Sequence, residues 1–237
     1  MDIHKIETLL RKTRQQLKWK VIYGRSPDTL IPVIKCDPGH KKHEIVFPES
    51  YDSSVANLDM LHELTHALLA ETVSPAFAGG QIRFRTERGG QVWRNYVTVP
   101  VQVATDWFVD GWFMNKSPGL AKEYLGIRIG MALAPFVKSR KLPSGNLDSD
   151  RCGLALLTAQ SEKYGIGSYI DDIDDDGLKT AVRLFLSVDE TKPTHDALLD
   201  LKNDLVAVST PDLLVGYDPP THTWFLGERQ GSSWSRI

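Results

Sequence analysis

Two histidines and a glutamate lie within five residues of one another, in the stretch His62-Glu63-Leu64-Thr65-His66. In this H-E-x-x-H pattern the histidines stand four apart, so a helix places both imidazoles on one face, where they can hold one Zn²⁺. Glu63 between them can polarise a water held by the metal. Because the same letters also fit an amphipathic helix with two exposed histidines, the surrounding sequence has to decide between the two interpretations.

A pair of carboxylates follows 40 residues after His66, in a segment that is otherwise apolar and aromatic. Asp106 and Asp110 stand four apart in residues 103–113, and a buried aspartate is costly unless it is paired or bound to a metal. A catalytic zinc needs a third protein ligand and an open position for water. The pair therefore supplies the best candidates for this ligand, with His40 or His43 as alternatives.

With these residues the chain resembles the zincin metallopeptidases, most closely their gluzincin branch. In that branch the helix after the H-E-x-x-H helix carries E-x-x-x-D, whose first acid binds zinc and whose second acid orients a ligating histidine. The resemblance implies that Asp106 is the third ligand and that Asp110 accepts the N–H of His62. It covers roughly residues 15–115, and it departs from the family pattern in having Asp where Glu is usual.

The resemblance implies zinc-dependent hydrolysis of a peptide or protein substrate, with Glu63 as the general base. It also implies that the substrate adds to an edge strand beside the active helix, for which His43–Phe47 is the candidate. A donor to the oxyanion is expected from beyond the zinc helix. No motif selects among the candidates for this donor, which are Arg94, Tyr96, His195 and His222.

The elements before the motif have to bring its helix against a core. Ile3, Ile6, Leu9 and Leu10 predict an amphipathic helix at the start of the chain. A strand is expected over residues 17–23. Residues 31–35 and 43–47 are expected to form a hairpin around a turn-rich segment.

The helix that carries the motif is expected to begin after a cap at Ser53 or Ser54 and to run to about Glu71. At about 100° per residue, its leucines and Met60 fall opposite the two histidines and Glu63. One face therefore packs on a core while the other presents the motif to a cleft.

The later elements include a second hairpin over residues 81–85 and 91–97, then a helix from Pro100 to about Asn115. Further helices are expected over residues 120–137, 150–164, 177–188 and 194–208, followed by a short β-like or irregular tail around Trp224. The predicted class is α+β. Residues 1–116 form a zincin-like half with a small mixed sheet, and residues 117–237 form a mainly helical region.

The composition is that of an ordinary soluble globular chain of 237 residues, with 41% hydrophobic and 24% charged residues. The net charge of −2 gives no general attraction to nucleic acid or to anionic membranes. No apolar run approaches the roughly 20 residues of a membrane span. A polar N-terminus and only two cysteines, Cys36 and Cys152, favour a cytoplasmic protein without a disulfide framework.

Other features allow rival interpretations. Four arginines on the second predicted hairpin suggest contact with nucleic acid, although the solvated face of a half-buried strand is favoured; they are Arg83, Arg85, Arg88 and Arg94. The acidic run 172–177 resembles the start of a calcium loop, but Arg183 stands where a bidentate Glu is needed, so helix capping is favoured. The chain could also be a metal-stabilised sensor or binding module without catalysis, against which the intact Glu63 argues.

Overall fold

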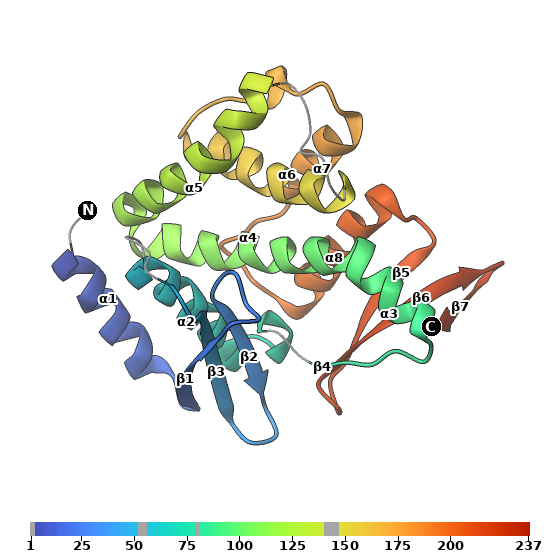
Figure 1. Cartoon of the computed structure of the whole chain (residues 1–237), viewed down its shortest axis with the longest axis horizontal. Coiled ribbons are helices and arrows are strands. Elements are labelled where there is room, and N and C mark those ends of the chain that lie inside the picture. Colours follow the sequence, from blue (N-terminus) through green and yellow to red (C-terminus); the bar gives the residue numbers. More distant parts are fainter. Residues whose placement is uncertain (1–2, 52–55, 79–80, 140–146) are drawn as a thin grey trace.

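A computed structural model of the chain describes residues 3–51, 56–78, 81–139 and 147–237 (Figure 1). Its elements follow one another in this order: α1 (Ile3–Gln16), β1 (Lys20–Ser26), β2 (Val33–Asp37), β3 (Lys42–Pro48), α2 (Ala56–Thr72), η1 (Pro75–Phe77), β4 (Gln81–Ile82), α3 (Glu87–Val92), η2 (Trp93–Val97), α4 (Thr98–Lys116), α5 (Pro118–Ser139), α6 (Leu147–Tyr164), η3 (Ile170–Asp172), α7 (Asp176–Ser187), α8 (His195–Ser209), β5 (Leu213–Asp218), β6 (Thr223–Gln230) and β7 (Ser233–Arg236). The fold is mixed α+β, as the sequence predicts.

The first sheet has the strand order β1-β3-β2, in which β1 is parallel to β3 and β2 is antiparallel to it. The hairpin predicted around residues 37–40 is confirmed as β2 and β3. The prediction that His43–Phe47 is the edge strand is wrong, because this segment belongs to the central strand β3. Its inward-facing residues, such as Ile45, are fully buried. The edge that faces the motif helix is β2, which contacts α2.

Helix α2 carries the H-E-x-x-H motif and is buried on both faces over residues 61–70. Leu61 and Leu64 pack into the core, as the helical periodicity predicts, and α1 covers the same helix with Ile6 and Leu10. The predicted caps Ser53 and Ser54 lie outside the described residues. The histidine face is also shielded from bulk solvent, because other elements enclose it.

Helix α4 runs through the middle of the molecule, with α2 and the first sheet on one side and α5, α6 and α7 on the other (Figure 1). It contacts α2, α5, α6 and α8. A helix in this position has to be apolar all round, and Trp107, Phe108 and Val109 are fully buried on successive faces. Asp110 is buried among them, so its carboxylate must find partners within the protein.

The second predicted hairpin is wrong. Only Gln81–Ile82 forms a strand, which pairs in parallel with β6, while residues 87–92 form α3 and residues 93–97 form a single π-helical turn. Thr86 begins α3 by accepting a hydrogen bond from the amide of Gly89. Gly89 is required by packing rather than by a turn, since a Cβ there would lie 2.6 Å from the carbonyl carbon of Ile237.

The C-terminal helices agree with their predicted ranges to within a few residues, and the tail after them forms a meander of β5, β6 and β7. The apolar core is continuous across position 116, since it includes Phe108 and Phe113 before it and Leu125 and Leu157 after it. The division of the chain at residue 116 stays a prediction. Within the described residues, none of the helices has the length and apolar character needed to cross a membrane.

Candidate metal centre

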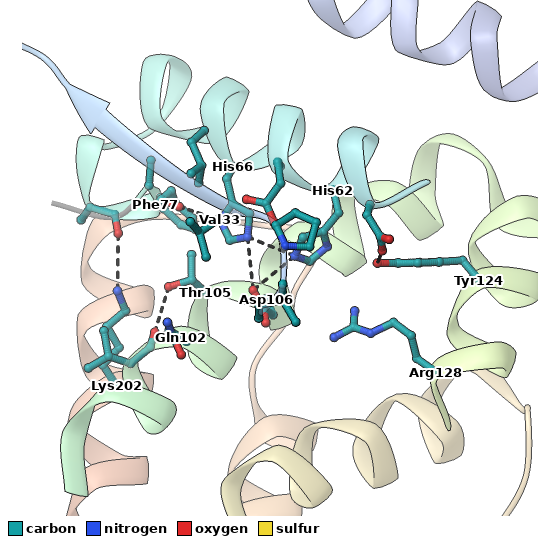
Figure 2. A pocket seen from close by; sticks show the side chains of 18 of the residues that line it. Val33, His62, His66, Phe77, Gln102, Thr105, Asp106, Tyr124, Arg128 and Lys202 are labelled. Atoms are coloured by element: carbon teal, nitrogen blue, oxygen red, sulfur yellow. Dashed lines mark hydrogen bonds and ion pairs between the residues drawn. The ribbon is translucent and has the colours of Figure 1, made fainter. Parts of the chain in front are cut away.

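Helices α2 and α4 bring together one side-chain atom each from His62, His66 and Asp106 (Figure 2). The Nε2 atoms of the two histidines are 3.1 Å apart. Oδ1 of Asp106 lies 3.4 Å from Nε2 of His62 and 3.2 Å from Nε2 of His66. The three atoms form a nearly equilateral triangle, and their residues line a cavity.

The size of this triangle fits a divalent transition metal. A tetrahedral zinc with ligands at about 2.0–2.1 Å separates its ligand atoms by about 3.3–3.4 Å. The three separations of 3.1, 3.2 and 3.4 Å are close to this value. Two imidazole nitrogens and one carboxylate oxygen also form the donor set of a catalytic zinc site, which keeps its fourth position open.

The opposite ring nitrogens of both histidines are fixed by acceptors. Nδ1 of His66 donates to the carbonyl oxygen of Phe77 at 2.8 Å, and Nδ1 of His62 donates to Oδ1 of Asp110 at 3.0 Å. In the neutral rings, the hydrogen therefore resides on Nδ1 and each Nε2 presents a lone pair to the centre. Two lone pairs and a carboxylate this close repel one another unless a cation or an added proton lies between them.

The electrostatics of the cluster follow from its burial. Burial by itself raises the pKa of Asp106, but contact with His62 and His66 brings that pKa well below its usual range. For His62, burial lowers the pKa, but the carboxylates of Asp110 and Asp106 raise it well above its ordinary value. The cluster therefore holds its carboxylate ionised and attracts positive charge.

Asp110 is held by residues from the C-terminal helices. Its Oδ2 accepts a hydrogen bond from Nε2 of Gln160 at 2.8 Å and lies 3.3 Å from Nη1 of Arg128. Gln160 comes from α6 and Arg128 from α5. The orientation of His62 therefore depends on both helices through one carboxylate.

Glu63 borders the same cavity and is only 7% exposed. Burial raises the pKa of its carboxyl, against the opposing effect of His66 and His62. If a metal binds at this cluster, a neighbouring carboxylate with a raised pKa would be suited to accept and return a proton.

The cavity has a volume of about 330 Å³. Residues 31–34, which lead into β2, line one wall. Figure 2 shows Tyr124 and Arg128 on one side of the metal cluster and Lys202 on the other. On the first side, Tyr51 and Asp59 also line the cavity, and Asp59 joins Tyr51 to Tyr124 by hydrogen bonds. On the second side, Phe77, Gln102 and Thr105 lie toward Lys202 in Figure 2, and Trp224 lies against the ammonium of Lys202.

Several of these residues were not identified from the sequence. Asp59 stands one turn before Glu63 on the same helix and accepts hydrogen bonds from the hydroxyls of Tyr51 and Tyr124. Its helical spacing could have indicated a place near the motif. Tyr124 and Arg128 carry no such signal, because their approach depends on how α5 packs.

The other candidates lie away from the cluster. Nε2 of His43 contacts Glu71 at 3.0 Å, and His40 is exposed beside Asp37. None of the four predicted oxyanion donors lines the cavity in the described part of the chain. Instead, Nδ1 of His195 lies 2.9 Å from Oγ of Ser74, and Nδ1 of His222 lies 3.4 Å from the hydroxyl of Tyr217.

One residue of the arginine group and one of the acidic run have structural partners. Arg88 pairs with Glu228 at 2.6 Å, while Arg83 and Arg85 are exposed. Asp175 caps α7 by accepting from the amide of Leu178, and it also pairs with Arg151. The expectation that the acidic run caps a helix is confirmed for Asp175.

Comparisons with protein-family models, with curated proteins and with solved structures found no match to this chain.

Proposed function

We propose that this chain is a zinc-dependent peptide hydrolase. The observation that carries the proposal is the convergence of His62 Nε2, His66 Nε2 and Asp106 Oδ1 within 3.1–3.4 Å, with both Nδ1 atoms already engaged as donors. These three residues would hold the metal, and Asp110 would fix the ring of His62. When bound, zinc supplies Lewis-acid chemistry that acidifies a water and stabilises negative charge on a substrate carbonyl.

Glu63 acts as the general base in this proposal. Its carboxylate accepts a proton from the attacking water and then delivers that proton to the nitrogen of the leaving amine. Its position between the two histidines keeps it on the same side of α2 as the metal cluster. Between these two steps Glu63 is protonated, and burial favours this protonated carboxyl because it raises the pKa of Glu63.

An extended peptide binds along β2 rather than β3. In the described residues β2 pairs only with β3, so its other edge retains backbone donors and acceptors for an added strand. Residues 31–34 line the cavity at this edge. The pairing would place a peptide bond over the metal cluster, with its side chains directed alternately toward and away from the cavity.

The first test separates hydrolysis from metal binding. Glu63→Gln removes the base but leaves all three ligands, so we expect it to retain zinc while cleavage of a fluorogenic peptide library falls at least about 100-fold. Glu7→Gln, an exposed change on α1, is the matched control and should cleave like wild type. Cleavage by Glu63→Gln at the wild-type rate would refute the role of this residue.

The second test uses metal analysis of Asp106→Ala and Asp110→Ala. Loss of the third ligand should abolish stoichiometric zinc, whereas loss of the carboxylate behind His62 should weaken zinc affinity about 10- to 100-fold. Competition with a chromophoric chelator measures the Kd for zinc of each variant. Undiminished zinc in Asp106→Ala would place the third ligand elsewhere.

A further inference from the structure

Lys202 is a buried cation at one end of the cavity, and neither the metal cluster nor the base requires it. It lies on the inner face of α8 among Leu198, Leu201 and Leu205, and only 1% of its surface is exposed. Its ammonium lies 4.0 Å from the centre of the Trp224 ring and donates one long hydrogen bond, of 3.4 Å, to the carbonyl of Ala76. In the described part of the chain, none of the ion pairs involves Lys202.

A buried ammonium is costly unless an anion pairs with it. A carbonyl and an aromatic face compensate only part of this cost. Burial consequently lowers the pKa of Lys202 to about 7, although the negative charge of Asp106 opposes the shift. A buried charge that is left short of partners and borders a cavity is typical of a ligand site.

The opposite end of the cavity does not have this deficit. Arg128 already faces the carboxylate of Asp110, and both oxygens of Asp59 accept hydrogen bonds from tyrosines. Figure 2 shows Arg128 and Lys202 on opposite sides of the metal cluster. The two ends therefore differ in charge compensation, and the uncompensated positive charge lies at the α8 end.

The surroundings of Lys202 suit a carboxylate. Gln102 lines the same end of the cavity and is exposed, so its amide can donate to a second oxygen of an anion. Phe77 and Trp224 give this end apolar walls, and the hydroxyl of Thr105 donates to the carbonyl of Val101. One ammonium and one amide match a singly charged carboxylate, whereas a phosphate dianion needs more donors.

We propose that Lys202, with Trp224 and Gln102, forms a subsite for a substrate carboxylate, so that the enzyme prefers peptides that carry one on the α8 side of the cleaved bond. The carboxylate is either the C-terminal α-carboxylate or the side chain of Asp or Glu. This inference rests on the proposed peptide hydrolase activity. It deepens that activity by naming the substrate class.

The test compares matched fluorogenic peptides with zinc-loaded protein. One pair differs in a free or amidated C-terminus, and a second series replaces Glu by Gln at each position around the cleaved bond. In wild type we expect neutralisation of the recognised carboxylate to lower kcat/KM about 10- to 100-fold. The pair that shows this loss identifies which of the two carboxylates the subsite binds.

Substitutions then assign the preference to Lys202. Lys202→Met should cleave charged and neutral peptides at similar kcat/KM, and Lys202→Arg should retain part of the preference. Lys192→Met is the matched control, since Lys192 is 81% exposed, and it should discriminate like wild type. Equal cleavage of charged and neutral peptides by wild type overturns the subsite. The subsite is also overturned if Lys202→Met lowers kcat/KM by the same factor for every peptide, since Lys202 would then act at the reacting carbonyl.

A binding measurement makes the result independent of turnover. Zinc-loaded Glu63→Gln is titrated with the same labelled peptides by fluorescence anisotropy, with and without Lys202→Met. Carboxylate-dependent binding that disappears in the double variant supports the subsite, even if wild type cleaves none of the peptides. Absence of cleavage by wild type would refute only the hydrolase proposal. Absence of carboxylate-dependent binding overturns the subsite whether or not peptides are cleaved.

Discussion

His62 and His66 present equivalent Nε2 atoms to the cluster but are tethered differently at Nδ1. His62 donates to the carboxylate of Asp110, and His66 donates to a backbone carbonyl. A carboxylate partner increases the basicity of an imidazole more than a neutral carbonyl does. Metal affinity should therefore depend on the ionisation of Asp110, whose pKa His62 and Arg128 lower against the effect of burial.

The burial of Lys202 predicts how the free energy of unfolding of the zinc-free protein depends on pH. The unfolded chain protonates this amine as the pH falls below its ordinary pKa of 10.5, whereas the folded protein leaves it neutral until about 7. The unfolded state therefore binds more protons between these values, so the free energy of unfolding decreases as the pH falls through this window. Between pH 9.5 and 7.5, the free energy of unfolding should therefore fall by about 2 kcal/mol more in wild type than in Lys202→Met.

Urea denaturation of wild type and Lys202→Met at both pH values measures this difference, because other titrating groups contribute equally to the two proteins. Lys192→Met serves as the control and should follow wild type. An identical pH dependence in wild type and Lys202→Met would show that the amine is charged in the folded protein at neutral pH.

At the residue scale, much of the cluster could be located from the sequence. Helical spacing places His62 beside His66, and two acids in an apolar segment indicate Asp106 and Asp110. The partners of Asp110 could not be found in this way, because Gln160 and Arg128 reach it only through the packing of α5 and α6. Lys202 did have a signal, since it interrupts the buried face of α8.

At the element scale, local patterns could predict the helices but not the second sheet. Helices α2 and α4–α8 follow from apolar periodicity and caps. Strand β4 pairs with β6, which is more than a hundred residues later, and no local pattern specifies such a pairing. The sequence predicts a strand over residues 91–97, because the glycines before it suggest a turn, whereas the buried Trp93 and Val97 stand at helical spacing.

The position of α4 depends on one close contact. A Cβ at Gly111 would lie 2.2 Å from Cγ of Glu190. Glu190 cannot easily move, since its carboxylate lies 2.5 Å from the ammonium of Lys163 and accepts from Tyr164. Gly111→Ala should therefore lower the free energy of unfolding by about 1–3 kcal/mol, despite the better helix propensity of alanine.

Gly126→Ala on α5 is the matched control, because a Cβ there meets no heavy atom within 4 Å. It should stabilise the protein by up to about 1 kcal/mol. Urea denaturation measures both variants. A Gly111→Ala protein as stable as Gly126→Ala would mean that α4 and the segment at Glu190 can separate without cost.

At the scale of the whole molecule, the metal cluster lies where several parts of the chain meet. Two of the proposed ligands come from α2 and the third from α4, and α4 also contacts α5, α6 and α8. Asp110 extends the connection to α5 and α6. A metal bound at this point would link the sheet side of the molecule to its helical side.

Metal removal should therefore lower the stability of the entire fold. Free zinc at about 1,000 times its Kd stabilises a protein that binds it only when folded by about 4 kcal/mol. For a chain of this size that corresponds to a rise in Tm of roughly 8–16 °C. Thermal unfolding followed by circular dichroism, with zinc and with an excess of chelator, measures the shift.

His66→Ala, which lacks one ligand, should show nearly the same Tm under both conditions. If zinc-loaded wild type unfolds at the same temperature after chelation, the metal does not connect α2 and α4 within the cooperatively folded core.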